Sequence, residues 1–220
     1  MKISDWMHTL YFNLKVFDFK TAIKLPVYVG SKTAIKNISK GCIIIPENIH
    51  RGMISIGVNP GSSGLRGEKE TGCIDVEEGS QIVLGQNVII TAGGVLKAIN
   101  NSRIEIGDNF YANPRLTLLA KKHILIENDV MMGWNCLIND GDGHPIYDKQ
   151  TNKRINNNED VIISDNVWIG AEVTLLKGTF IPKNSIVGYG SLVTRRYDKE
   201  NVVIAGKPAG IIKENVYWKR

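Results

Sequence analysis

The chain has 220 residues, of which 43% are hydrophobic and 22% are charged, and its formal net charge at pH 7 is +5. This is the composition of an ordinary globular protein, and its positive charges are too dispersed to identify an anionic partner. No stretch approaches the roughly 20 apolar residues of a membrane span, and the N-terminus lacks the layout of a signal peptide. Cys42, Cys73 and Cys136 are odd in number and have no CxxC spacing, which excludes a disulfide framework or a cysteine zinc site and favours reduced core residues in a cytoplasmic protein.

Residues 1–28 are rich in aromatic and aliphatic side chains and predict a short helix followed by an extended arm that ends near Pro26. We expect this segment to cap the domain that follows, because the open end of a β-structure exposes unpaired strand edges. Lys15, Lys20 and Lys24 beside the aromatic residues leave a role at a membrane surface as an alternative. Membrane contact is not expected for the chain as a whole.

Residues 29–200 are interpreted as one parallel β-helix, because apolar side chains recur there with a period of six. The period is clearest at Ile163, Ile169, Leu175, Ile181, Val187 and Val193. Helices space apolar residues by three and four, and half-buried strands by two, so neither element produces this pattern. Hexapeptides predict an all-β fold in which three hexads form one triangular turn and inward aliphatic residues stack as the core. Glycines after the aliphatic position, as at Gly170 and Gly188, are expected where the chain bends.

The period is broken at two places. A step of eight from Leu118 to Ile126 places two inserted residues near Lys121-Lys122, at a corner of the coil. A step of twenty-five from Ile138 to Ile163 predicts an excursion over about residues 140–160. Long loops on regular scaffolds are often functional.

His144 in this excursion is the candidate catalytic residue. Pro145 follows it, and a residue before proline favours an extended backbone, so the ring can project from the scaffold. Asp140, Asp142 or a backbone carbonyl could fix one ring nitrogen as a donor and leave the other free as a base. The alternative is an ordinary histidine in an exposed loop.

Four short motifs resemble, in order and spacing, those of the hexapeptide-repeat acetyltransferases, whose fold is a left-handed parallel β-helix. The motifs are Tyr111-Ala112-Asn113, Gly143-His144-Pro145, Val167-Trp168-Ile169-Gly170 and Ala205-Gly206-Lys207-Pro208-Ala209. The likeness runs over about residues 104–213. It extends to galactoside and maltose O-acetyltransferases and, more strongly, to O-acetyltransferases of bacterial capsule and O-antigen sugars, including polysialic acid. Arg154-Ile155-Asn156 and the ending with Trp218 carry this stronger likeness.

The resemblance implies an acetyl-CoA-dependent O-acetyltransferase that acts on a sugar hydroxyl in a bacterial surface polysaccharide or its precursor. His144 matches the catalytic histidine, which acts as a general base. Asn113 matches a residue that contacts the acceptor, with Tyr111 beside it, and Trp168 matches an aromatic residue near the thioester. Trp134 is a further candidate for the border of this groove. Ordinary packing at the corners of the coil is the alternative for all of these positions.

For the donor, the resemblance implies a groove beside the C-terminal coils and no metal. The residues placed along this groove are Trp168, Gly170, Ala171, Gly188, Tyr189, Thr194, Arg195 and Lys207. Small residues permit close approach, and basic side chains, with Arg196 and Lys213 in addition, suit the phosphates. Tyr189 departs from the pattern, since relatives often have a small residue there.

The resemblance also implies a cytoplasmic homotrimer with three active sites between subunits and no nucleic-acid partner, and residues 201–220 are expected to form a C-terminal tail. Two alternatives keep the fold: an O-acetyltransferase of antibiotics or other xenobiotics, and an N-acetyltransferase of amino-sugars. A third is a metal enzyme similar to the γ-class carbonic anhydrases, or a non-catalytic β-helix. Zinc would need clustered histidines, but His8, His50, His123 and His144 are scattered.

Overall fold

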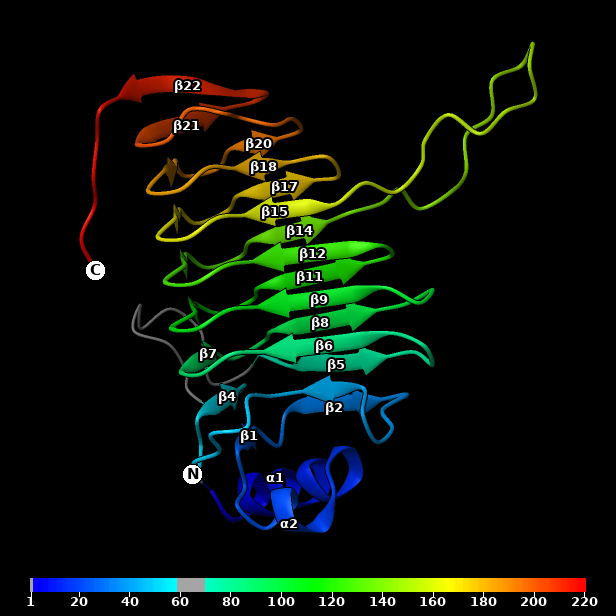
Figure 1. Cartoon of the computed structure of the whole chain (residues 1–220), viewed down its shortest axis with the longest axis vertical. Helices are drawn as coiled ribbons and strands as arrows, with labels where there is room; N and C mark the ends of the chain where they lie inside the picture. The colour runs from blue at the N-terminus through cyan, green and yellow to red at the C-terminus, as the bar shows by residue number, and fades with distance from the viewer. Residues whose placement is uncertain (1, 59–69) are drawn as a thin grey trace.

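The computed structural model describes residues 2–58 and 70–220. In these residues the chain winds into a tall triangular coil, with two helices at one end and the C-terminal strands at the other (Figure 1). Each side of the triangle is a sheet of parallel strands, and up to the C-terminal end consecutive strands pass from one sheet to the next. The last strand is the exception, because it pairs antiparallel with the strand before it in one of the three sheets. The predicted all-β parallel β-helix is therefore confirmed.

The three sheets are called A, B and C. Sheet A contains β1 (Val27–Val29), β4 (Ile54–Ile56), β7 (Val88–Ile90), β10 (Tyr111–Ala112), β13 (Met131–Met132), β16 (Trp168–Ile169), β19 (Ile186–Val187), β21 (Val202–Gly206) and β22 (Ala209–Glu214). Sheet B contains β2 (Thr33–Lys36), β5 (Gly72–Val76), β8 (Val95–Ala98), β11 (Thr117–Ala120), β14 (Leu137–Asn139), β17 (Thr174–Leu176) and β20 (Leu192–Val193). Sheet C contains β3 (Ile43–Ile44), β6 (Gln81–Leu84), β9 (Arg103–Ile106), β12 (His123–Ile126), β15 (Val161–Ile163) and β18 (Phe180–Ile181).

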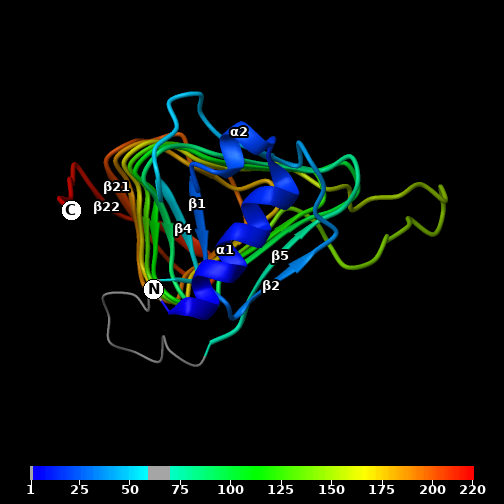
Figure 2. The same cartoon turned by 90° about the horizontal axis from the view of Figure 1, so that it is seen from below.

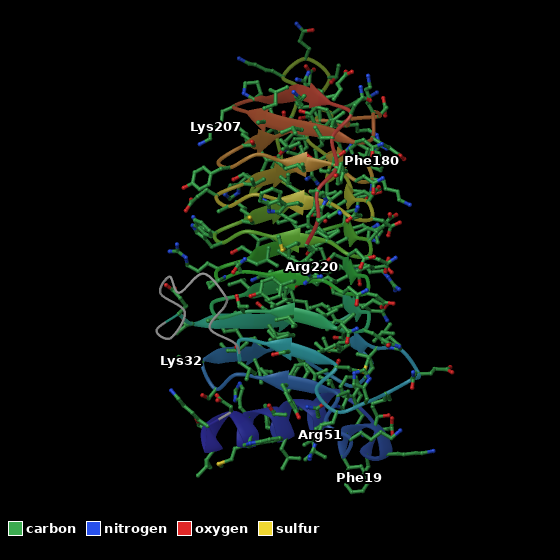
Figure 3. All side chains as sticks on the ribbon, turned by 90° about the vertical axis from the view of Figure 1, so that its left-hand side faces the viewer. Phe19, Lys32, Arg51, Phe180, Lys207 and Arg220 are labelled. Atoms are coloured by element: carbon green, nitrogen blue, oxygen red, sulfur yellow. The ribbon has the colours of Figure 1, made fainter. Side chains whose placement is uncertain are left out.

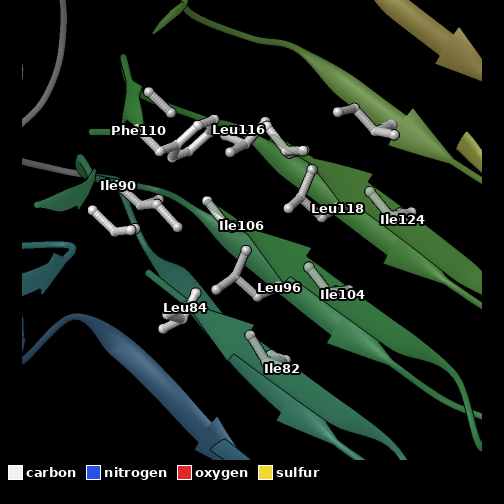
Figure 4. Close-up of a cluster of buried hydrophobic side chains, with 14 of the residues drawn as sticks. Ile82, Leu84, Ile90, Leu96, Ile104, Ile106, Phe110, Leu116, Leu118 and Ile124 are labelled. Atoms are coloured by element: carbon white, nitrogen blue, oxygen red, sulfur yellow. The ribbon is translucent and has the colours of Figure 1, made fainter. Parts of the chain in front are cut away.

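Alternating burial along the strands builds the core. In β9, Ile104 is buried while Arg103 and Glu105 are partly exposed on the outer face. Strand register places Ile104 between Ile82 and Ile124 of the neighbouring coils. The core consequently consists of columns of aliphatic side chains that run along the coil (Figure 4).

The corners between sheets C and A depend on asparagine. Asn87, Asn109, Asn166 and Asn184 adopt left-handed backbone conformations, with φ between 55° and 59°. The amide of Asn87 donates to Oδ1 of Asn109 at 3.1 Å, and that of Asn166 donates to Oδ1 of Asn184 at 2.9 Å. Asparagine tolerates this conformation better than most residues, so its backbone forms the bend while its side chain links successive coils.

Two helices, α1 (Ile3–Val16) and α2 (Phe19–Ala22), cover the N-terminal end of the coil (Figures 1 and 2). Helix α2 lies where the sequence predicted an extended arm, and that prediction is wrong. The carboxylate of Asp18 accepts a hydrogen bond from the backbone N–H of Thr21 at 3.1 Å. This N-cap stabilises a helical turn before Pro26.

Helix α1 packs beside β1, which is the edge strand of sheet A in the described residues. The hydroxyl of Thr9 donates to the carbonyl of Val29 at 3.2 Å and accepts from its N–H at 3.0 Å. The amide of Asn13 donates to the carbonyl of Val27 at 2.7 Å and accepts from its N–H at 3.3 Å. Two buried side chains thus satisfy four backbone groups of an edge strand, which supports the predicted capping role of this segment.

The excursion leaves the coil between β14 and β15 and projects from the corner between sheets B and C, opposite sheet A (Figures 1 and 2). At the C-terminal end, β21 pairs with β19, and β22 pairs with β21. The coil therefore continues beyond residue 200, and the region predicted as a tail starts with two strands. Neither described helix has the length and apolarity needed to cross a bilayer.

Candidate active site

The outer face of sheet A carries the predicted acceptor residues. Tyr111 and Trp168 share one register position, with Met131 between them. Asn113 follows β10 at the corner between sheets A and B, where its backbone N–H donates to the carbonyl of Met132 at 3.0 Å. Its side-chain amide contacts the same carbonyl at 3.3 Å. The structure therefore places Tyr111, Asn113 and Trp168 on one side of the coil.

Gly133, Gly170 and Gly188 form a column at this corner, one on each of three successive coils. Each N–H donates at 2.8 Å to a carbonyl of the next coil, those of Ile169, Val187 and Ile204. A Cβ added at Gly133 would lie 2.4 Å from the backbone nitrogen of Ala171. One added at Gly170 would lie 2.9 Å from the backbone nitrogen of Tyr189, and one at Gly188 would lie 2.9 Å from Cβ of Ala205. None of the three has a positive φ. Coil-to-coil packing, and not a left-handed bend, therefore requires these glycines.

Trp134, Ala171 and Tyr189 follow these glycines on the same three coils. Because the side chain of Ala171 is small, the rings of Trp134 and Tyr189 meet across it edge to face, with centroids 6.4 Å apart. Tyr189 is largely exposed. The bulk of Tyr189, unexpected from the resemblance, therefore forms an aromatic rim with Trp134 beside the glycine column.

The predicted phosphate-binding residues occupy two corners. Lys207 is exposed in the turn between β21 and β22, at the C-terminal end of the coil (Figure 3). Thr194 and Arg195 follow β20, at the corner between sheets B and C. Arg195 donates to the carbonyl of Ala209 at 2.9 Å and is thereby engaged in holding the start of β22.

His144 is exposed, but the backbone around it is anchored by the buried amide of Asn156. Nδ2 of Asn156 donates to the carbonyl of His144 and to Oδ2 of Asp142, both at 2.8 Å. Oδ1 of Asn156 accepts from the N–H of Ile146 at 2.6 Å. One side chain thus fixes the chain on both sides of His144 and leaves the imidazole at the surface.

Lysines and carboxylates tie this loop to the coil. Nζ of Lys177 lies 2.6 Å from Oδ2 of Asp142, and this bond holds the pKa of that carboxyl below its usual range. Nζ of Lys121 donates to the carbonyl of Asp142 at 2.7 Å. At the base of the loop, buried Asp140 accepts from the N–H groups of Lys121 and Lys122 at 2.7 and 2.8 Å. Burial raises the pKa of Asp140, while these bonds stabilise its charged form.

A single chain does not bring His144 to the acceptor residues. The His144 loop stands at the corner between sheets B and C, whereas Tyr111 and Trp168 lie on sheet A, the opposite side of the triangle (Figure 2). A site that contains all of them needs the loop of a second copy.

The C-terminal residues return along sheet A, a path that no pattern in the sequence predicts. The ring of Trp218 lies 6.2 Å from that of Trp168, and its Nε1 donates to the carbonyl of Asn166 at 2.8 Å. The guanidinium of Arg220 lies 5.7 Å from the centre of the Tyr111 ring. Spacing along the sequence carries no signal for a segment that folds back over distant coils.

The described residues contain no group of three or more histidine, cysteine or acidic side chains placed to hold a metal ion. The ring of His8 contacts the carbonyl of Thr33 at 2.7 Å, and His123 pairs with Glu105 at 2.9 Å. These two histidines therefore have structural partners in separate parts of the coil.

No family model matches the sequence. The chain is 31% identical over 160 residues to an Escherichia coli K12 protein provisionally named as a lipopolysaccharide biosynthesis O-acetyl transferase, over 67% of this chain and 81% of the relative. It is 43% identical over 108 residues to a polysialic acid O-acetyltransferase of Neisseria meningitidis, over 49% of this chain and 50% of the relative. Including the Neisseria protein, five curated relatives are matched over only 41 to 57% of their own length.

The coil is also similar to a crystal structure of a polySia-specific acetyltransferase. The TM-score is 0.71 and the identity 26%, over 87% of this chain and 74% of the other. This likeness agrees with the left-handed coiling that the motifs implied. Because the identity to the lipopolysaccharide relative extends over most of that protein, the chain belongs to the hexapeptide-repeat acetyltransferases.

Proposed function

We propose that this protein transfers an acetyl group from acetyl-CoA to a sugar hydroxyl of a bacterial surface polysaccharide or its precursor, in the cytoplasm. The observation that carries the proposal is the exposed His144 on an anchored loop. Relatives named as polysialic acid and galactoside O-acetyltransferases support the acceptor class.

In this proposal His144 moves the proton. Imidazole is the side chain best suited to exchange a proton near neutral pH. The ring takes the proton of the acceptor hydroxyl as that oxygen bonds to the acetyl carbon, and it then gives the proton to the departing sulfur. Asn113 and Tyr111 hold the acceptor, and Trp168 borders the reacting carbonyl.

Acetyl-CoA supplies the acetyl group as an activated thioester. The proposed donor corner is formed by Gly170, Ala171 and Gly188, which the family motifs assign to acetyl-CoA and which lie on neighbouring coils beside the exposed ring of Tyr189. Tyr189 lines this corner, and a Cβ at Gly190 would find open space. Lys207 then offers its ammonium to a phosphate, with Thr194 and Arg195 as the more distant candidates. The N–H groups of Gly170 and Gly188 already bond to the next coil, so neither is assigned to the oxyanion.

We further propose a homotrimer in which the His144 loop of one copy reaches sheet A of the next. The separation of the two parts within one chain supports this arrangement. Because the coils would pack side by side around a closed rotation axis, each copy contributes to two sites.

A shared site predicts complementation between two inactive variants. In co-expressed mixtures of His144→Ala and Trp168→Ala subunits, about one quarter of the sites receive a native loop and a native sheet A. Activity should therefore return to roughly a quarter of the wild-type value if the subunits mix at random. The unfractionated mixture would be compared with each variant alone. Trimers that carry two different affinity tags, purified from it, should reach about one third of the wild-type activity, because each of them has one intact site of three. Activity no higher than that of the separate variants would contradict the shared site.

Replacing Asn156 by leucine is expected to lower kcat about ten-fold or more, because His144 loses its fixed position. The KM for acetyl-CoA should change little, since Asn156 lies in the loop and not at the donor corner. Asn157→Leu, at the exposed neighbouring position, is the matched control. Equal kcat values in the two variants would show that the amide does not position His144.

The proposed reaction is tested by thiol release from acetyl-CoA with a panel of acceptors: polysialic acid, capsular oligosaccharides, galactosides, amino-sugars and chloramphenicol. Release that requires a sugar with a free hydroxyl supports the proposal. Release only with amino-sugars or chloramphenicol would favour the N-acetyl or xenobiotic alternative. Absence of both release and acetyl-CoA binding would overturn the acetyltransferase assignment.

A further inference from the structure

The outer side of α1 and α2 carries a stripe of exposed apolar side chains, called the cap stripe here. Its members are Ile3, Met7, Leu10 and Leu14 of α1, with Phe19 and Ile23 at α2. Ile3 is 82% exposed, Met7 71% and Phe19 72%. The spacing of three and four residues places the α1 members on one helix face. A contiguous exposed apolar surface of this kind marks an interaction site.

The cap stripe faces along the coil axis and away from the sheets. Phe12 and Val16 bury the opposite face of α1 in the core, and Thr9 and Asn13 bond it to β1. The two helices form the end of the molecule in Figure 1, and Figure 3 shows Phe19 pointing beyond the ribbon at that end. Side-by-side packing of coils does not cover a surface with this orientation.

Basic side chains border the cap stripe. Lys15, Lys20 and Lys24 are exposed on the two helices and the turn after them. Arg51 lies close by, with its guanidinium 5.5 Å from the centre of the Trp6 ring. The rim of the apolar surface is therefore cationic.

The two acidic residues of the same segment have local hydrogen-bond partners. Asp5 accepts from the N–H and the hydroxyl of Ser31 at 2.9 and 2.7 Å, and Asp18 caps α2. Both carboxyls have pKa values below the usual range; hydrogen bonds from Thr21 lower that of Asp18, and those from Ser31 outweigh the opposing effect of burial at Asp5. Neither carboxyl is ion-paired to the lysines of the rim among the described residues.

We propose that the cap stripe docks on the surface of an anionic phospholipid bilayer. The apolar side chains enter the boundary between headgroups and acyl chains, and the lysine ammoniums meet headgroup phosphates. A second copy of the chain fits less well, because the lysine rims of two copies would face each other across the contact. This docking takes up the alternative that the sequence left open for residues 1–28, and it does not depend on acetyl transfer.

Vesicle co-sedimentation of the full chain tests the proposal. Binding is expected to vesicles that contain phosphatidylglycerol and to be much weaker to phosphatidylcholine alone. Replacing Lys15, Lys20 and Lys24 together by glutamine should weaken the binding about a hundred-fold. The double variant Met7→Ser, Phe19→Ser should weaken it at least about ten-fold. Ile212→Ser, at an exposed position of β22, is the matched control and should bind like the wild type.

All substituted side chains are exposed, so the variants should keep the wild-type melting temperature. If the protein binds neither vesicle type, the proposal is overturned. Equal binding by the wild type and all variants would also overturn it. Concentration-dependent association that Met7→Ser, Phe19→Ser abolishes, without vesicle binding, would identify a second copy as the occupant and also overturn it.

Discussion

Replacing His144 by alanine is expected to lower the turnover of acetyl transfer by a factor of about a hundred or more. The imidazole is the proposed carrier of the proton between the acceptor oxygen and the leaving sulfur. Without it, the hydroxyl must attack while still protonated or lose its proton to water. The affinity for acetyl-CoA should remain nearly unchanged, because the loop contributes no residue to the donor corner.

The experiment compares kcat and acetyl-CoA affinity of the wild type, His144→Ala and the control His50→Ala, which removes another histidine from an irregular surface segment. The His144 side chain is exposed and its ring makes no hydrogen bond within residues 2–58 and 70–220, so the melting temperature should not change. A full turnover rate in His144→Ala would exclude this residue as the base. A drop shared by His50→Ala would point to a general defect instead.

The sequence predicted the coil because its core repeats along a single axis, one coil after another. Each side of the triangle contributes an inward aliphatic side chain, as at Ile163, Ile169 and Val187, so aliphatic residues recur in the sequence with a period of six. The eight-residue step from Leu118 to Ile126 predicted an insertion at a corner of the coil, and Lys121 and Lys122 lie at the corner between β11 and β12. Such corners accept insertions without disturbing the stacked core.

The contacts that the sequence did not predict join residues with no shared period. Asn156 bonds back to His144 across a loop, and Trp218 packs on Trp168 from the far end of the chain. Helix α2 depends on one N-cap, Asp18, inside a segment dominated by aromatic residues. The roles of Gly170 and Gly188 were not predicted either. The sequence alone does not show whether a glycine is required by a bend or, as here, by close packing of coils.

Replacing Asn13 by leucine is expected to have the largest effect on stability. The substitution leaves the N–H and the carbonyl of Val27 unsatisfied in a fully buried place, while leucine fills a similar volume. Each orphaned group costs about 1–3 kcal/mol, so we expect the free energy of unfolding to fall by about 3 kcal/mol. Leu14→Asn, the reverse change on the exposed side of α1, should lower it by only about 1 kcal/mol, because it leaves no backbone group unsatisfied.

The loss should be local before it is global, because each coil contacts only its neighbours. Hydrogen exchange of the Val27 and Val29 amides should accelerate in Asn13→Leu, while that of the Ile169 and Val187 amides stays slow. An uncovered β1 also offers unpaired backbone groups to another chain, so light scattering should rise with protein concentration. Wild-type exchange rates and scattering in Asn13→Leu would show that α1 does not protect this edge. Fast exchange confined to Val27 and Val29, the expected result, would show that the side chains of Thr9 and Asn13 protect this edge in the place of a neighbouring strand.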